Sequence, residues 1–217
     1  MSVRIVLIHA TAVSMPPIRE AFERLWPEAE PVNLLDDALS RDLGIAGRQT
    51  PEIIERILAL ARYAVRINAA GILFTCSAFG QAIARVKAEL EIPVLKPNEA
   101  MFEDALDAGS HLGLLLTFAP SVAAMEVELR DLAKERRKKI DLEIVLVEAA
   151  MSALSEGDLK THNRLLAEAA SQLSACDAVI LGQFSTSAAL EDVKGAMRCP
   201  VLTSPHSAVA RLRSMLE

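Results

Sequence analysis

The chain has 217 residues, of which 52% are hydrophobic and 24% are charged, and its formal net charge is −6. This length allows one large domain or two small lobes, and the acidic balance argues against nucleic acid as a partner. No apolar run reaches the roughly 20 residues that a membrane helix needs. The N-terminus carries no signal-peptide pattern and the three cysteines lack framework spacing, so we expect a cytoplasmic protein without membrane contact.

Short apolar runs alternate with amphipathic helical patterns, which indicates a parallel α/β fold with strands covered on both faces. In the first half we predict strands at Arg4–His9, Pro31–Leu35, Gly71–Thr75 and Val94–Lys96. Helices are predicted there at about 50–67, 77–90 and 99–108, the first with Thr50 as its capping residue. In the second half we predict strands at Leu112–Thr117, Glu143–Val147, Ala178–Leu181 and Val201–Thr203, and helices at about 158–173, 186–197 and from His206 onward.

The two halves resemble each other in sequence. The segment ILFTCSAFG, from Ile72, aligns with ILGQFSTSA, from Ile180, and this alignment places Phe184 opposite Cys76. The same relation lays RIVLIHATAV on LGLLLTFAPSV. Such a duplication predicts two pseudosymmetric Rossmann-like lobes, 1–97 with 206–217 and 98–205, each with a four-stranded parallel sheet. We expect an active-site cleft between equivalent strand ends.

Cys76 is the candidate catalytic residue because it follows an apolar strand at a strand-to-helix turn. In a parallel α/β sheet, ligands bind beyond the carboxyl ends of the strands, and a helix N-terminus favours a thiolate. The alternative is that Cys76 is a small buried hydrophobic residue. Cys176 and Cys199 lack this setting, and we expect both to serve packing.

Other strand ends supply candidate substrate-binding residues, mostly hydroxyls that could hold a carboxylate together with backbone N–H groups. They are His9, Thr11, Thr75, Ser77, Thr117, Phe184, Ser185, Thr186 and His206. A purely structural role is an equal alternative for His9, while His206 could cap the last helix. Asp36, after the second strand, could cap the segment that follows it.

Metal and cofactor sites are not predicted. No cysteine or histidine pair has metal-ligand spacing, and no G-x-G-x-x-G follows the first strand. The basic run Lys134–Lys139 is typical of a solvated helix end.

With these turns, TCSAFG and GQFSTS, the chain resembles the aspartate/glutamate/hydantoin racemase superfamily, which includes arylmalonate decarboxylase and maleate isomerase. The resemblance covers nearly the full length, with Cys76 at the place of the family's first cysteine and Phe184 at that of the second. It implies a cofactor-independent isomerase of racemase type, acting on the α-carbon of a small carboxylic acid such as an amino acid, hydantoin or diacid.

Loss of one thiol rules out symmetric two-thiol racemisation, because a phenyl group neither gives nor takes a proton. Cys76 could work with a non-cysteine partner, protonate one face after a malonate-type decarboxylation, or add to an unsaturated diacid during cis–trans isomerisation. Phe184 would then give the cleft an apolar wall. The rival from another class is a two-lobed carboxylate-binding protein without catalysis. Paired lobes of this size also suggest a homodimer.

Overall fold

The computed structural model describes residues 2–217 and divides into two compact units. The first is Met1–Ala100 with Ala208–Glu217, and the second is Met101–Ser207. The boundaries fall inside two helices, α5 (Glu99–Ala108) and α10 (Ser204–Leu216). Within residues 2–217, no helix combines the length and the apolar character needed to cross a bilayer.

The sheet of the first unit has the order β2-β1-β3-β4, and every neighbouring pair is parallel. Its strands are β1 (Arg4–His9), β2 (Glu30–Leu35), β3 (Gly71–Phe74) and β4 (Val94–Leu95). The helices that connect them are α1 (Met15–Leu25), α2 (Ala38–Ala46), α3 (Pro51–Arg66) and α4 (Gly80–Glu89). Short 3-10 turns, η1 (Ala12–Ser14) and η2 (Ser77–Phe79), precede α1 and α4.

The second unit repeats this topology with the order β6-β5-β7-β8, again all parallel. Its strands are β5 (His111–Leu116), β6 (Asp141–Leu146), β7 (Ala178–Leu181) and β8 (Val201–Thr203). Its connecting helices are α6 (Val122–Glu135), α7 (Glu148–Ser155), α8 (Leu159–Ala170) and α9 (Leu190–Ala196). The 3-10 turns are η3 (Ala119–Ser121), η4 (Ser171–Leu173) and η5 (Ser185–Ala189).

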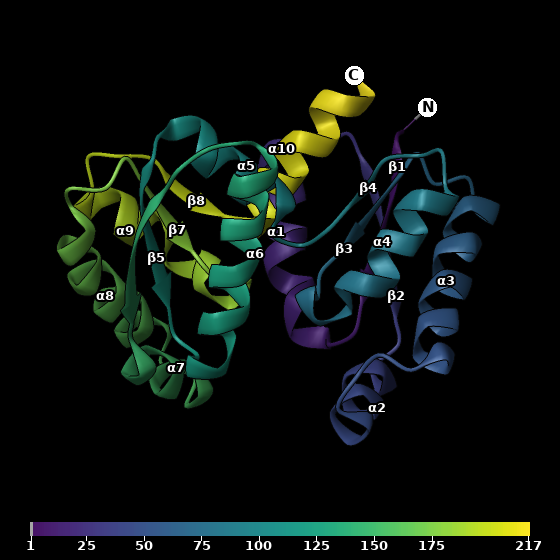
Figure 1. Ribbon diagram of the computed structural model, residues 1–217, viewed down its shortest axis with the longest axis horizontal. Coiled ribbons are helices and arrows are strands. Elements are labelled where there is room, and N and C mark those ends of the chain that lie inside the picture. The colour runs from purple at the N-terminus through teal and green to yellow at the C-terminus, as the bar shows by residue number, and fades with distance from the viewer. Residues whose placement is uncertain (1) are drawn as a thin grey trace. The chain divides into compact units, whose positions relative to one another are not determined.

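Both sheets are covered by helices on two faces, which Figure 1 shows for each unit in turn. In the first unit, Ile57 of α3 and Ile83 of α4 pack with Ile72 of β3 on one face. In the second unit, α5 and α6 cover one face of β5 and β7, while α8, η4 and α9 cover the other. The predicted two-lobed α/β fold with four-stranded parallel sheets is confirmed.

The predicted strands differ from the observed ones by at most two residues at either end. Thr50 caps α3 as expected, its hydroxyl accepting from the Ile53 N–H at 3.4 Å. The C-terminal helix begins at Ser204, two residues before the predicted start at His206. Helices α1, α2, α6 and α7 had no individual prediction, and α1 opens with Pro16 and Pro17, which interrupt a helical pattern except in the first turn.

Candidate active site

Cys76 lies two residues beyond the end of β3, at the turn that opens η2. Its backbone is extended, with φ −130° and ψ 119°, and its side chain is partly exposed. The Ala78 N–H lies near its sulfur and favours the thiolate. A strand end, a free thiol and a backbone donor therefore meet at the predicted position.

The pKa of the Cys76 thiol is raised, contrary to the expectation from sequence that the helix N-terminus lowers it. Burial is the main cause, because desolvation disfavours the charged thiolate. The Ala78 N–H acts in the opposite direction but is outweighed. A 3-10 turn also separates Cys76 from α4, whose first residue is Gly80. The group is accordingly a thiol in the resting protein.

The residue before Cys76 is anchored by a buried polar network. The Thr75 hydroxyl lies 2.8 Å from His9 Nδ1 and 2.9 Å from Ser14 Oγ, while His9 Nε2 lies 2.8 Å from Asn33 Oδ1. These contacts suit a neutral imidazole that donates from Nε2 to Asn33 and accepts at Nδ1 from a hydroxyl. Burial lowers the pKa of His9, which favours the same neutral form.

His9 has no exposed surface, so the geometry assigns it a different role from the substrate contact expected from sequence. Both of its ring nitrogens are occupied inside the first unit. We therefore expect His9 to hold Thr75, and through it the turn that presents Cys76. This corresponds to the structural alternative for His9.

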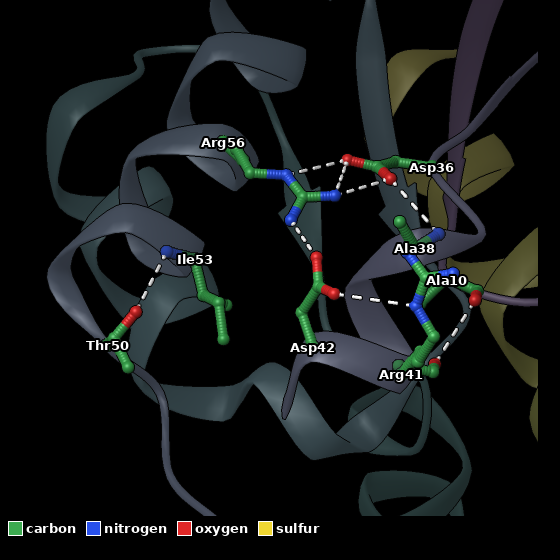
Figure 2. Close-up of polar contacts among 9 residues, drawn as sticks. Ala10, Asp36, Ala38, Arg41, Asp42, Thr50, Ile53 and Arg56 are labelled. Carbon is green, nitrogen blue, oxygen red and sulfur yellow. Dashed lines mark hydrogen bonds and ion pairs between the residues drawn. The ribbon is translucent and has the colours of Figure 1, made fainter. Parts of the chain in front are cut away.

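Asp36, the acid after β2, is also held within the first unit. Figure 2 shows the Arg56 guanidinium between Asp36 and Asp42, and its Nη2 lies 2.6 Å from each Asp36 carboxylate oxygen. Asp36 Oδ1 accepts from the Ala38 N–H at 3.3 Å, at the start of α2. The bonds from Arg56 lower the pKa of Asp42. Asp36 thus ties α2 to α3, in addition to the capping role expected from sequence.

The backbone register of the two sheets corrects the alignment of the halves by one residue. Ile5 pairs with Gly71 in the first sheet, and Leu112 pairs with Ala178 in the second. Both pairs begin one residue after the start of β1 and β5, so the two ladders are equivalent. The residue two positions beyond β7 is then Gln183, which is equivalent to Cys76 by strand register.

This correction changes three assignments made from sequence. Phe184 is not the counterpart of Cys76 by strand register; it follows Gln183, as Ser77 follows Cys76. Likewise the sequence alignment placed Thr117 opposite His9. By strand register Leu116, the last residue of β5, is equivalent to His9, and Thr117 is equivalent to Ala10. The sequence alignment was in error by one residue because the strands are continuous apolar runs, which match almost equally well in neighbouring registers.

Gln183 is fixed by hydrogen bonds of its own. Its Oε1 accepts from the Thr117 N–H at 3.2 Å and lies 3.3 Å from the Thr117 hydroxyl, and its Nε2 donates to Ser121 Oγ at 2.8 Å. The amide is neutral and cannot act as an acid or base. The second repeat therefore offers a hydrogen-bonding clamp where the first offers a thiol.

The predicted site residues fall into two groups. Four are buried: His9, Thr75, Thr117 and Thr186. Six are partly or fully exposed: Thr11, Cys76, Ser77, Phe184, Ser185 and His206. The Thr186 hydroxyl turns inward and donates to the Gln183 carbonyl at 2.6 Å, while His206 Nδ1 lies 2.8 Å from the hydroxyl of Thr203, the residue before α10. Because the Nε2 of His206 is buried as well, the other five residues of the exposed group are the ones available to a ligand.

Three residues that hold these turns or the network behind them were missed from sequence: Ser14, Asn33 and Gln183. Ser14 and Ser121 are equivalent by the corrected register, and each donates to the carbonyl of the residue three positions earlier, Thr11 and Phe118. The sequence signal for Ser14 was the serine that ends both ATAVS (residues 10–14) and FAPS (residues 118–121). Asn33 gave none, because its role depends on the pairing of β1 with β2.

The comparisons with known proteins agree with this architecture. The model of the Asp/Glu/Hydantoin racemase family matches residues 5–212. No curated protein matches the sequence. The chain is similar to the crystal structure of an aspartate racemase homologue from Pyrococcus horikoshii OT3, with a TM-score of 0.73, 17% identity and 99% of both chains covered.

Two further solved structures show the same fold. A mutant of arylmalonate decarboxylase in the sulfate ion associated form gives a TM-score of 0.69 at 17% identity, covering 98% of this chain and 93% of that one. Allantoin racemase from Klebsiella pneumoniae gives 0.69 at 16% identity, covering 99% and 87%. Because the family model spans almost the whole chain, this protein belongs to the Asp/Glu/hydantoin racemase family.

Proposed function

We propose that the protein is a racemase-type enzyme that moves a proton at the α-carbon of a small carboxylic acid, with Cys76 as the acid/base and without a cofactor. The observation that carries the proposal is the free, partly exposed thiol of Cys76 at the carboxyl end of β3, in a turn that also brings the Ala78 N–H near its sulfur. Membership of the racemase family supports the reaction class.

The substrate carboxylate would bind at exposed hydroxyls and backbone N–H groups of the strand-end turns. Thr11, Ser77 and Ser185 are the hydroxyl residues there that keep exposed surface. Such donors stabilise the charge that grows on the carboxylate when the α-carbon loses its proton. The Cys76 thiol first gives its proton to water, and the thiolate then takes the α-proton while the bound carboxylate becomes an enediolate.

One thiol makes this chemistry one-sided. Gln183, at the position that answers Cys76, is a neutral amide already engaged by Thr117 and Ser121. Cys76 alone would return the proton to the face from which it came, so inversion requires a second donor. His206 is the candidate from sequence for that role, but its Nδ1 lies 2.8 Å from the Thr203 hydroxyl and its Nε2 is buried, so the proposal assigns inversion to water.

Decarboxylation of a malonate-type acid is a second candidate, favoured by the raised pKa of Cys76. Loss of carbon dioxide leaves the bonding electron pair on the α-carbon as an enediolate. The Cys76 thiol then gives its proton to that carbon, becomes a thiolate and recovers a proton from water. This sequence starts from the protonated thiol, which is the resting form that burial favours.

Proton NMR in D₂O tests both candidates with the purified full-length chain. The panel contains aspartate, glutamate, hydantoins, maleate, and aryl- and alkylmalonates, each incubated with wild type, Cys76→Ala and Cys199→Ala. Cys199 is another partly exposed thiol, so its variant is the matched control. We expect deuterium at an α-carbon with wild type and Cys199→Ala, and none with Cys76→Ala.

The outcome also separates the alternatives. Exchange without loss of a carboxyl group supports racemase-type chemistry, whereas a monoacid product carrying deuterium selects the decarboxylase. Conversion of maleate to fumarate would select cis–trans isomerisation. Line broadening without any exchange would favour a carboxylate-binding protein, and exchange that persists in Cys76→Ala would remove Cys76 from the mechanism.

A further inference from the structure

Three potential metal ligands meet at the amino-terminal edge of the sheet in the second unit. His111 is the first residue of β5, Glu143 is the third residue of β6, and Cys176 lies two residues before β7. In the parallel register His111 pairs with Asp141, two residues before Glu143, so neighbouring strand starts bring these side chains together.

The ligand atoms are close enough to share one ion. His111 Nε2 lies 2.6 Å from Glu143 Oε1, and Cys176 Sγ lies 4.0 Å from the same oxygen. All three atoms lie within 4.8 Å of one another. Ligand atoms around a tetrahedral zinc ion are about 3.3–3.8 Å apart, given bonds of about 2.0–2.3 Å. Side-chain adjustments of about 1 Å would therefore convert this cluster into three corners of a tetrahedron.

We propose that His111, Glu143 and Cys176 bind one divalent transition-metal ion of the zinc type. Imidazole nitrogen, thiolate sulfur and carboxylate oxygen are together the donor set that suits zinc, and exclude magnesium or calcium as the preferred ion. The fourth corner falls to water or to Asp141, whose Oδ2 lies 4.0 Å from His111 Nε2. On binding, the ion replaces the proton between His111 and Glu143 and the proton of the thiol.

The surroundings of Cys176 are negative, as a cation site requires. Three carboxylates, those of Glu143, Asp177 and Asp141, lie near its thiol. Asp177 is already engaged, since its Oδ2 accepts from the Ser110 and His111 N–H groups at 2.8 Å. A divalent cation would offset this accumulation of negative charge.

This site is separate from the candidate active site. The turns of Thr117 and Gln183 follow the carboxyl ends of β5 and β7, whereas His111 and Cys176 stand at the opposite ends of the same strands. We therefore infer a structural ion that ties together the starts of three strands. No metal site was predicted from sequence because no cysteine or histidine pair has the short spacing of metal ligands. Here Glu143 is 32 residues from His111 and 33 residues from Cys176, and the fold brings them together.

Zinc binding to the reduced, EDTA-treated full-length chain tests the proposal. Zn²⁺ affinity is measured by competition with a chromogenic chelator, and Co²⁺ is added as a spectroscopic probe of thiolate ligation. We expect one Zn²⁺ per chain and a cobalt–thiolate charge-transfer band. His111→Phe and Glu143→Gln alter partly exposed side chains and should each weaken Zn²⁺ binding by more than about 10-fold, the lower end of the effect of losing even an outer-shell partner.

Cys176 is buried in the core, so Cys176→Ser could weaken Zn²⁺ binding by destabilising the fold. Its result is therefore interpreted only together with those of His111→Phe and Glu143→Gln. Matched controls are Cys76→Ser, the thiol of the first unit, and Glu126→Gln, another partly exposed carboxylate in an ion pair. Both should bind Zn²⁺ as wild type does. Absence of stoichiometric Zn²⁺ binding would overturn the proposal. Unchanged affinity in His111→Phe and Glu143→Gln, or loss of binding in Cys76→Ser, would do the same.

Discussion

The hydroxyl of Thr75 should stabilise the turn that carries Cys76 by an amount that can be measured. Thr75 is 7% exposed and His9 is fully buried. Thr75→Val keeps the shape of the side chain but removes contacts of 2.8 Å to His9 Nδ1 and 2.9 Å to Ser14 Oγ. His9 Nδ1 then keeps only Ser14 Oγ, at 3.1 Å. Leaving a buried polar atom poorly paired costs about 1–3 kcal/mol, which is the expected loss in the free energy of unfolding.

Urea unfolding followed by circular dichroism measures this loss, with the midpoint falling and the m-value unchanged. A double-mutant cycle with Ser14→Ala isolates the contact between the two hydroxyls, and residues in one network couple by about 0.5–3 kcal/mol. Val127→Thr, an isosteric change at an exposed position of α6, is the control and should change stability by less than about 0.5 kcal/mol. If Thr75→Val is as mild as this control, or strictly additive with Ser14→Ala, the network does not anchor the turn.

Three further predictions follow from the hydrogen bonds and charges. Because burial lowers the pKa of His9, the unfolded chain binds a proton more readily than the folded chain does. The stability that neutral His9 contributes is complete above about pH 6.5 and is lost as the pH falls. Unfolding curves of His9→Gln should therefore show a smaller fall in the free energy of unfolding between about pH 6.5 and 5 than those of wild type. Gln183→Leu should lower the unfolding free energy by about 1–2 kcal/mol in urea melts and Phe184→Leu by less; the reverse order would contradict the conclusion that Gln183 holds this turn. Arg56→Met should be less stable than wild type by an amount that shrinks between about 0.1 and 1 M salt, because Asp36 and Arg56 are only partly buried, and a salt-independent difference would contradict an ion-pair origin.

The fold could be predicted because its signals are local. Runs such as RIVLIH and AVIL are continuous apolar strands, and a parallel sheet covered on both faces requires that pattern. Thr50 and Pro51 mark the start of α3 through capping chemistry that acts within one turn. Strand ends were less certain, since a single residue at an edge changes little in hydrophobicity.

The candidate site was predictable only in part. The position of Cys76 followed from the strand before it, but the partner turn depended on which residues of β5 and β7 pair across the sheet. A one-residue slip along an apolar run leaves the hydrophobic pattern nearly unchanged, so sequence selected Phe184 where the backbone register selects Gln183. The direction of the Cys76 pKa was also missed, because burial of the thiol depends on the packing of the folded unit.

The divergence of the two repeats has a packing explanation. In the first repeat, Thr75 anchors its turn through His9, which leaves the following residue, Cys76, free. In the second, the equivalent pair is Gly182 and Leu116, and a Cβ on Gly182 would lie 2.1 Å from Leu116 Cδ2.

An apolar packing pair therefore stands where the first unit has its polar anchor, and the turn of the second unit is held by other contacts. Gln183 does so, by bonding Thr117 and Ser121 from the position that answers Cys76. A side chain engaged in that way is unavailable for proton transfer, whatever its chemistry. The one-sided reaction that we propose thus rests on how the second turn is anchored as well as on the residue type at position 183.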